Sequence, residues 1–354
     1  MNHSAALAES APTILRTEIV LPGPVEPRGL VLRSAPLPDP RPGHVIVRME
    51  ATGVSFAEQQ MRRGKYYDQP AFPFVPGYDL VGTVSALGAA VDPALLGRRV
   101  AAVTKIGAWS THVEVDALDL LPVPDGLDPA AVETVIVNGI TAWQMLHDIA
   151  RVPKGGTIVV LGANGGVGST LLQLAREAGI RAIGTSASRH HPLLRELGAE
   201  PVDSADGAFY DTIRALAPAG VDAVFDHVGG PGIRRSWSLL RSGGALVAYG
   251  TASTKNDAGN SQLPVIKLFG LLALWNALPN GRRATFYNFW DGKARRPERF
   301  RGLKARAFGR VVALLAAGSL TPQIAARFPL AEAVSALELA ESRTVAGKVI
   351  LQST

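Results

Sequence analysis

One glycine-rich segment restricts the fold of this chain more than any other feature. It is Gly162-Ala-Asn-Gly-Gly-Val-Gly168, and it stands between the apolar run Thr157–Leu161 and the helical pattern Val167–Ala178. In such a strand–loop–helix unit the backbone comes close to a phosphate, and the helix N-terminus presents free N–H groups to it. The segment predicts a dinucleotide site, and a tight turn without a ligand is the alternative. The candidate cofactor-binding residues in it are Gly162, Ala163, Asn164, Gly165, Gly166, Val167 and Gly168.

From about Gly139 onward, short apolar runs alternate with helical patterns. This order is typical of βαβ units around a parallel sheet and predicts a doubly wound, Rossmann-type α/β fold. Strands are predicted at Thr157–Leu161, Arg181–Thr185, Asp222–Phe225 and Ala245–Tyr249. Helices are predicted at Val167–Ala178, Pro192–Leu197, Ala208–Leu216 and Ile233–Leu240.

The first part of the chain has a different residue pattern, rich in proline and in short apolar runs. Eight prolines fall within its first 42 residues, and each fixes φ and removes a backbone donor, which disfavours long helices. Apolar and polar residues alternate over Val45–Thr52, and short apolar runs follow at Leu80–Leu87 and Val100–Val103. These patterns predict a small, mostly β domain. The end of the chain again has the residue pattern of the first part. A helix is predicted there at Leu330–Glu341 and a strand at Lys348–Leu351.

Composition excludes several kinds of site. The 354 residues contain no cysteine, which rules out a disulfide framework, an iron–sulfur cluster, a thiol nucleophile and thiolate-bound zinc. The absence of disulfides is consistent with a reducing compartment, and we expect a cytoplasmic protein. The net charge is +6, but ten basic and two acidic residues between Gly281 and Arg310 carry +8, so the remainder carries −2. One segment therefore explains the charge, and nucleic-acid binding is not predicted.

Neither an export signal nor a membrane span is predicted. Met1–Ser10 lacks both the basic and the apolar region of a signal peptide. The most apolar stretch, Leu263–Leu278, is interrupted by Pro264, Lys267 and Asn276, and it falls short of the roughly 20 apolar residues of a spanning helix.

The residues after the second strand of the predicted sheet favour NADP(H) over NAD. An NAD site commonly has an Asp or Glu about 20 residues beyond the glycine loop, at the end of this strand. Here that place reads Gly184-Thr-Ser-Ala-Ser-Arg-His-His191, in which Ser186, Ser188 and Arg189 can donate to a 2′-phosphate. A solvated Arg189 at the start of the next helix is the alternative. The turns after the later strands are His227-Val228-Gly229 and Tyr249-Gly250-Thr251. They should line the nicotinamide ribose through Val228, Gly229, Tyr249, Gly250 and Thr251.

Together with the glycine loop, four further motifs resemble those of a known family. They are Val54–Tyr66, Phe74–Val84, Asn138–Met145 and Glu341–Leu351. Across nearly its whole length the chain resembles the medium-chain dehydrogenase/reductases, in their zinc-independent quinone oxidoreductase-like branch. The resemblance implies a GroES-like, mostly β catalytic domain over residues 1–138, completed by about 319–354, and a Rossmann domain over 139–318. It also implies an active cleft at their junction, a homodimer, and NADPH-dependent hydride transfer to a quinone or an electron-poor C=C bond.

The resemblance also suggests catalytic candidates. Tyr66 matches a family tyrosine, and its phenol can donate to a developing oxyanion or can pack over the nicotinamide or the substrate ring. Ser55 and Glu58 replace the family's usual Asn and Asp, so Ser55 is a second candidate. Asn138 can donate to the nicotinamide amide or the substrate carbonyl, or can cap its helix. The chain offers neither a thiolate nor a His–Glu pair at the zinc-binding positions of related enzymes, so no metal is expected.

The segment from about 262 to 310 joins the apolar stretch to the basic residues. It can form a subunit interface, a wall for a bulky apolar substrate, or a surface that docks on an anionic membrane. Of these, the membrane surface is the least favoured. The alternative to a reductase is an NADPH-binding interaction or membrane-peripheral protein with little turnover.

Overall fold

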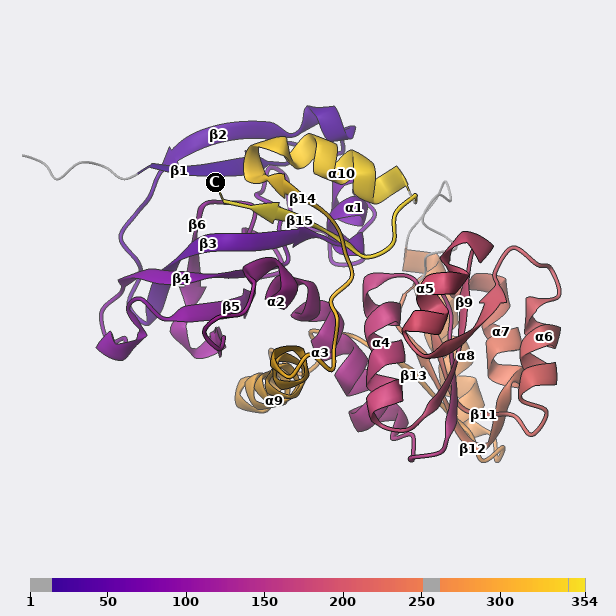
Figure 1. Ribbon diagram of the computed structural model, residues 1–354. Coiled ribbons are helices and arrows are strands. Elements are labelled where there is room, and N and C mark those ends of the chain that lie inside the picture. The colour runs from indigo at the N-terminus through magenta and orange to yellow at the C-terminus, as the bar shows by residue number, and fades with distance from the viewer. Residues whose placement is uncertain (1–14, 251–261, 343, 354) are drawn as a thin grey trace, which may run out of the picture.

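The protein has two domains built around separate β-sheets (Figure 1). The structure is a computed structural model that describes residues 15–250, 262–342 and 344–353. The α/β class predicted from the sequence is confirmed, because a mostly antiparallel sheet from both chain ends stands beside a parallel sheet from the middle of the chain.

The parallel sheet has six strands in the order β10-β9-β8-β11-β12-β13. Successive residues of β8 point to opposite faces, so that Ile158 and Val160 join one core and Val159 joins the other. Helix α4 covers the first face, whereas α6, α7 and α8 cover the second. The strands are β8 (Thr157–Val160), β9 (Arg181–Ser186), β10 (Ala199–Asp203), β11 (Val221–Asp226), β12 (Leu240–Ala248) and β13 (Arg283–Phe286). The helices are α4 (Gly166–Glu177), α5 (His191–Glu196), α6 (Phe209–Leu216), α7 (Ile233–Ser238) and α8 (Gln262–Ala277).

Several elements of this domain differ from the sequence-based prediction. Strand β12 starts at Leu240, and the helix predicted at Ile233–Leu240 therefore ends at Ser238. Strands β10 and β13 were not predicted, because one contains Pro201 and two acidic residues and the other has only four residues. Both are edge strands, where a proline is tolerated.

The second sheet is built from both ends of the chain. Strand β15 pairs with β3 in antiparallel register, with Val349 opposite Val54, so the end of the chain adds a strand to the sheet of the first part. The sheet comprises β3 (His44–Val54), β4 (Asp79–Leu87), β5 (Arg99–Val103), β6 (His112–Asp116), β7 (Leu121–Pro122), β14 (Ile324–Pro329) and β15 (Lys348–Gln352). A hairpin of β1 (Leu15–Val20) and β2 (Val31–Pro36) and helices α1 (Phe56–Arg62), α2 (Pro129–Val135) and α10 (Ala333–Ser342) complete the domain.

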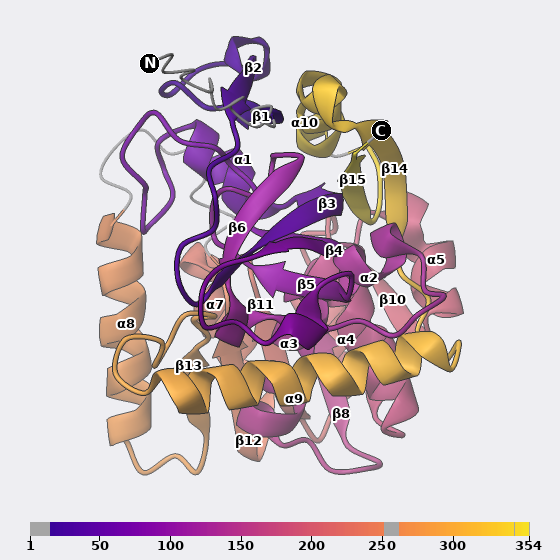
Figure 2. The ribbon, with the colours of Figure 1, turned by 90° about the vertical axis from the view of Figure 1, so that its left-hand side faces the viewer.

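Two helices join the domains. One is α3 (Val137–Trp143), which continues as a π-helix over Gln144–Ala150. The other is α9 (Pro297–Ala316), which crosses beneath α3 and β5 (Figure 2). The basic side chains of Arg301 and Lys304 on α9 pair with Asp116 and Asp119 of the first domain. Because α9 packs on both domains, the boundaries near residues 138 and 319 stay a prediction.

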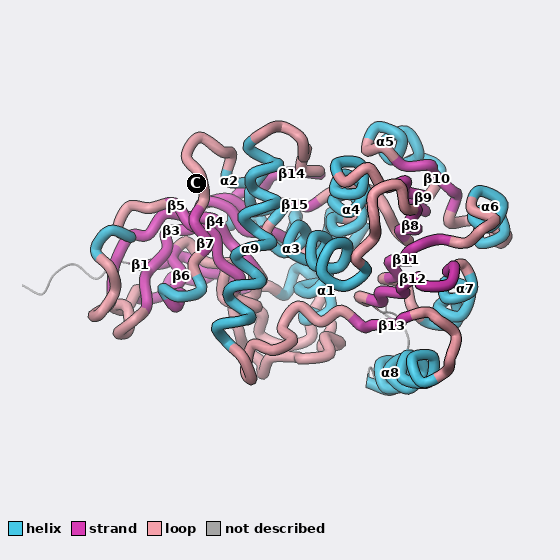
Figure 3. Tube along the Cα trace, turned by 90° about the horizontal axis from the view of Figure 1, so that it is seen from below, coloured by secondary structure: helices cyan, strands magenta, loops and turns pink. Residues whose placement is uncertain are grey.

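Helix α8 closes the edge of the parallel sheet (Figure 3). The side-chain amide of Asn276 donates to the carbonyl oxygen of Ala284 in β13 at 2.7 Å and accepts from its N–H at 2.8 Å. Asn280 accepts from the N–H of Arg282. An edge strand offers unpaired backbone groups to other chains. Asn276 occupies two such groups on β13, and Asn280 holds the residue just before the strand.

A buried charged cluster lies where α2, β4 and β15 meet. The Nζ of Lys348 is 2.6 Å from Oε1 of Glu133 and 3.2 Å from Oδ1 of Asp79, and all three side chains are buried. Burial opposes the charge of Lys348, but attraction to Asp79 and Glu133 outweighs it and raises the pKa of Lys348. The cluster fixes Asp79 directly beside Tyr78, so it supports the site described below.

We expect Lys348→Met to lower the free energy of unfolding by about 3 kcal/mol, because it leaves buried carboxylates without their cation. Urea denaturation of the purified protein measures this change. The matched control is Lys154→Met at an exposed lysine, which should stay within about 0.5 kcal/mol of the wild type. Equal stabilities of the two variants would contradict this account of the cluster.

Candidate functional site

The glycine loop is braced by the neighbouring strand β9. Gly162 has φ +65°, and its N–H donates to Oγ1 of Thr185 at 3.1 Å, while Ala163 donates to the Thr185 carbonyl at 2.8 Å. A Cβ at Gly168 would lie 2.7 Å from the carbonyl oxygen of Gly162. The turn therefore needs glycine at position 168 for its own packing, whether or not a ligand is bound.

The amino end of α4 remains open to a ligand. Its N-cap is Gly165, which has no side chain, and the N–H of Ser169 bonds to the Gly165 carbonyl. The N–H groups of Gly166, Val167 and Gly168 precede that bond in the first turn, where a helix has no internal acceptors for them. A Cβ at Gly165 would meet only the Gly162 oxygen, at 3.4 Å. These groups fit a pyrophosphate, which needs N–H donors and close backbone approach.

The turns after β11 and β12 meet the same loop. The Asp226 carboxylate accepts from the N–H groups of Val228 and Gly229, both at 2.8 Å, and from the Ser236 hydroxyl. A Cβ at Gly162 would lie 2.1 Å from the ring of His227, and one at Gly250 would lie 2.8 Å from the His227 carbonyl oxygen. The structure thus brings together the loop and the predicted residues Val228, Gly229, Tyr249 and Gly250. Thr251 lies outside the described residues.

The residues predicted to bind a 2′-phosphate differ in accessibility. Ser188 and Arg189 are exposed in a 3₁₀ turn that precedes α5. Ser186 is buried, and its hydroxyl donates to the Ala187 carbonyl. Ser188 and Arg189 are therefore the accessible members of this group.

Tyr66 lies in a hydrogen-bonded group of aromatic residues. Its hydroxyl is 3.1 Å from that of Tyr78, and the indole N–H of Trp290 donates to the Tyr78 oxygen. Burial, together with the neighbouring tyrosines, raises the pKa of Tyr66 well above its ordinary value, and burial also raises the pKa of Tyr78. Both phenols are therefore protonated donors at neutral pH.

Ser55 begins helix α1 as its N-cap. Its hydroxyl accepts from the N–H of Ala57 and donates to Glu58, whose carboxylate accepts from the Ser55 N–H at 2.9 Å. This reciprocal arrangement is a capping box. Burial raises the pKa of Glu58, although its bond from Ser55 acts in the opposite direction. The observed contacts of Ser55 thus account for the start of the helix.

Asn138 does not cap its helix, so the capping alternative is wrong. The N-cap of α3 is Ile136, and the amide of Asn138 donates back to the Thr134 carbonyl at 2.9 Å. A Cβ at Gly166 would lie 2.4 Å from Nδ2 of Asn138. The amide therefore packs directly against the amino end of α4, beside the candidate cofactor loop.

Sequence reasoning missed four residues that shape this site. They are Tyr78, Thr185, Asp226 and Trp290. Asp226 follows a predicted strand, so position alone could have identified it. The contact of Trp290 with Tyr78 joins residues 212 positions apart, and no local pattern indicates it.

The described residues contain no cluster of three or more His, Asp or Glu side chains placed to hold a metal ion. Zinc sites need three or four such ligands or cysteines, and this chain has no cysteine. The part of the chain that the structure describes therefore offers no set of side chains that fits a zinc ion.

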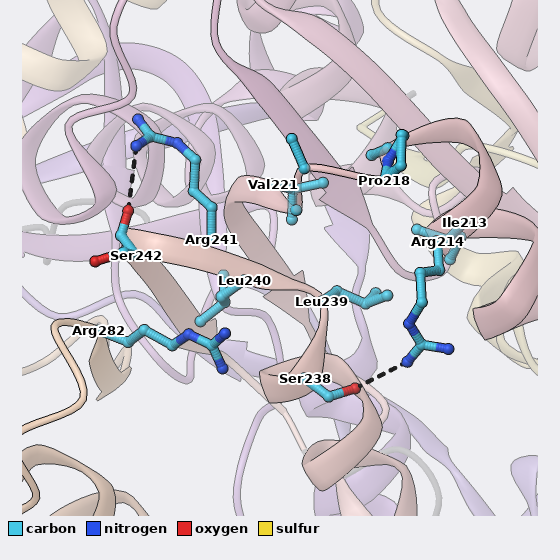
Figure 4. A pocket seen from close by; sticks show the side chains of 13 residues that line it. Ile213, Arg214, Pro218, Val221, Ser238, Leu239, Leu240, Arg241, Ser242 and Arg282 are labelled. Carbon is cyan, nitrogen blue, oxygen red and sulfur yellow. Dashed lines mark hydrogen bonds between the residues drawn. The ribbon is translucent and has the colours of Figure 1, made fainter.

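A surface pocket of about 310 Å³ lies at the opposite ends of the strands (Figure 4). Val221 and Leu240, at the amino ends of β11 and β12, line it with Arg214, Arg241 and Arg282. Arg214 pairs with Asp211, and Arg241 with Asp222. Ligands of doubly wound sheets bind at the carboxyl ends, so this pocket is separate from the glycine loop.

Comparisons with known proteins agree with this architecture. A sequence model described as "Alcohol dehydrogenase GroES-like domain" matches residues 41–125, and one described as "Zinc-binding dehydrogenase" matches residues 197–351. The human "Synaptic vesicle membrane protein VAT-1 homolog" is 28% identical over 326 residues, which are 90% of this chain and 81% of that protein. A "Mycocerosic acid synthase-like polyketide synthase" of Mycobacterium tuberculosis is 31% identical over 88% of this chain, but the match spans only 14% of the synthase.

Two solved structures have a similar fold over nearly the whole chain. A mycobacterial protein named Rv1454c, solved in complex with NADPH, has a TM-score of 0.80 and 27% identity, covering 95% of this chain and 99% of that chain. A structure named as a mycobacterial quinone oxidoreductase has a TM-score of 0.79 and 26% identity, with the same coverage.

We expect Gly165→Ala to keep the wild-type stability but to weaken NADPH binding by about tenfold or more, since the new methyl group projects into the open space at the amino end of α4. Thermal denaturation and NADPH fluorescence titration measure the two effects. Gly168→Ala is the comparison, because its methyl group meets backbone and should destabilise the fold. Unchanged NADPH affinity in Gly165→Ala would place the cofactor elsewhere.

Proposed function

The chain belongs to the medium-chain dehydrogenase/reductase superfamily, in its quinone oxidoreductase-like branch, and from this premise we propose that it is a zinc-independent, NADPH-dependent reductase. Its acceptor is a quinone or an electron-poor C=C bond of a bulky apolar substrate. The observation that carries the proposal is the open amino end of α4. Asn138 and the ends of β9, β11 and β12 lie around it.

NADPH is the cofactor, and it supplies a hydride from its nicotinamide ring. The N–H groups of Gly166, Val167 and Gly168 would bind the pyrophosphate, while Ser188 and Arg189 would donate to the 2′-phosphate. The turn held by Asp226 would lie against the nicotinamide ribose. The NADPH complex of the mycobacterial neighbour supports this assignment.

The acceptor needs a donor for the negative charge that it gains. Hydride addition to an enone or a quinone places that charge on oxygen, and a positioned hydroxyl stabilises it and then supplies a proton. Tyr66 takes this catalytic role, because its hydroxyl lies in a partly buried aromatic group, 3.1 Å from the hydroxyl of Tyr78, which can return a proton to it. Ser55 and Asn138 support the site structurally, one by starting α1 and the other by packing on Gly166.

Aromatic side chains favour a bulky apolar acceptor. Phe289 and Trp290 lie beside Tyr78, with ring centroids 6.4 and 5.7 Å away. Both come from the 262–310 segment, whose role as a substrate wall is thereby supported. The quinone oxidoreductase among the solved structures supports a quinone. The match to a polyketide synthase supports the alternative, an electron-poor C=C bond.

We expect the purified protein to oxidise NADPH in the presence of naphthoquinones or α,β-unsaturated ketones, and to use NADH at least about tenfold less well. Tyr66→Phe should lower kcat by about 100-fold and leave the NADPH affinity unchanged, since it removes only the proton donor. Stopped-flow absorbance of NADPH gives both numbers. Tyr287→Phe, at a buried tyrosine bonded to Gln144, is the control and should retain activity. Absence of turnover with every acceptor, despite NADPH binding, would refute the reductase.

A homodimer is part of the proposal. The outer face of α8 exposes Ile266, Phe269 and Leu274, and Leu278 follows just after the helix, each 50–61% accessible. Leu268 and Leu272 face the core. A helix that is apolar on both sides has a second face to cover. Since Asn276 occupies backbone groups of the edge strand β13, this helix face is the surface that a second copy covers.

The same surface supports the second candidate function, an NADPH-binding protein at a membrane surface with little turnover. The human relative is named as a vesicle membrane protein. Within the described residues, no helix is long and apolar enough to cross a bilayer. A cytoplasmic location stays a prediction from the sequence.

We expect the double variant Phe269→Gln/Leu274→Gln to be monomeric at concentrations where the wild type is dimeric, because it removes apolar contact area. Light scattering coupled to size exclusion measures this. Leu96→Gln/Leu118→Gln is the matched control, at exposed leucines of the other domain. If the wild type is monomeric and sediments with anionic liposomes while the α8 variant does not, the membrane function replaces the dimer.

A further inference from the structure

Three side chains from distant parts of the chain form a hydrogen-bonded row at the candidate active site. Trp290 donates from its indole N–H to the hydroxyl oxygen of Tyr78, and that hydroxyl lies 3.1 Å from the hydroxyl of Tyr66. Tyr78 is 6% exposed, and its backbone carbonyl accepts from the N–H groups of Thr104 and Lys105. The centre of the row is therefore rigid.

Trp290 is itself held from several sides. Its ring stacks on Phe300 of α9 with centroids 6.0 Å apart, and Nζ of Lys293 lies 4.6 Å from its centroid. Its backbone N–H donates to Oδ1 of Asn288, which also accepts from the Tyr67 hydroxyl. The 262–310 segment thus makes two contacts with the first domain. The Trp290 indole donates to the Tyr78 hydroxyl, and Asn288 accepts from Tyr67, the residue next to Tyr66.

The indole N–H favours one direction of the row. It can only donate, whereas a phenol both donates and accepts. A hydroxyl that accepts a hydrogen bond becomes a stronger donor, because bonds in a chain polarise one another. Either phenol can be the donor of the bond between Tyr66 and Tyr78. When Tyr78 donates, the Tyr66 O–H is available to the substrate.

We propose that Trp290 and Tyr78 are positioning residues that orient the Tyr66 hydroxyl as the proton donor to the reduced substrate. This inference rests on the reductase function proposed above and deepens it, since it assigns the aromatic part of the 262–310 segment to proton delivery. This role belongs to the Tyr78 hydroxyl and the indole N–H of Trp290, while the Trp290 ring keeps its place in the substrate wall.

The proton transfer balances as follows. Hydride brings two electrons and one hydrogen to the substrate, and the resulting oxyanion takes the proton from the Tyr66 O–H bond. The Tyr78 proton then moves to the Tyr66 oxygen. The remaining negative charge lies on Tyr78, where the N–H of Trp290 stabilises it until water returns a proton.

The test compares Trp290→Phe with Trp275→Phe. The first removes the N–H but keeps an aromatic ring on Phe300. The second removes an indole that stacks on Trp237 in the core, away from the site. We expect Trp290→Phe to lower kcat by about tenfold, with unchanged KM and NADPH affinity, and Trp275→Phe to keep the wild-type kcat.

The double variant Trp290→Phe/Tyr66→Phe separates positioning from packing. It should be no slower than Tyr66→Phe alone, because the indole acts through the Tyr66 hydroxyl. Losses that multiply in the double variant, a Trp290→Phe effect confined to KM, or a wild-type kcat in Trp290→Phe would overturn this inference and leave the reductase intact. A wild type without turnover would refute both proposals together.

Discussion

The open amino end of α4 is the constraint on which the rest of the site depends. A helix start with free N–H groups is costly unless something satisfies them, and a side-chain cap is the usual solution. Here the N-cap is Gly165, so no side chain competes with a ligand. The surrounding frame is correspondingly tight, with Thr185 bonded to Gly162 and Asn138 packed on Gly166. The rigidity of the frame keeps these donors available.

The basic residues between Gly281 and Arg310 contribute mainly to joining the two domains. Arg301 and Lys304 pair with Asp116 and Asp119 across the domain junction, and Arg306 pairs with Asp148. Lys304 is buried, and the cost of burying its charge lowers its pKa despite the attraction of Asp119. A sequence that looks like a charged surface is therefore in part an internal contact. This explains why its high local charge does not require an acidic macromolecule as a partner.

The sequence predicts what depends on local pattern. The buried strands of the parallel sheet, the glycine loop and the turns at the strand ends all follow from short runs of residues, and the structure brings them together. Helix α9 could also have been predicted, since Phe300, Lys304, Ala307, Phe308 and Val311 recur at helical spacing on its buried face. Strand β13 could not, because four residues carry too little periodicity and the strand is defined by its neighbour β12.

The catalytic candidates show the limit of prediction most clearly. Ser55 and Glu58 depart from the family's Asn and Asp, which suggested an altered site. In the structure they form a capping box, so the pair starts α1 and places the loop that leads to Tyr66. Tyr66 is the proposed donor. Its hydroxyl lies 3.1 Å from that of Tyr78, which accepts from the indole of Trp290, and sequence spacing alone does not indicate these contacts.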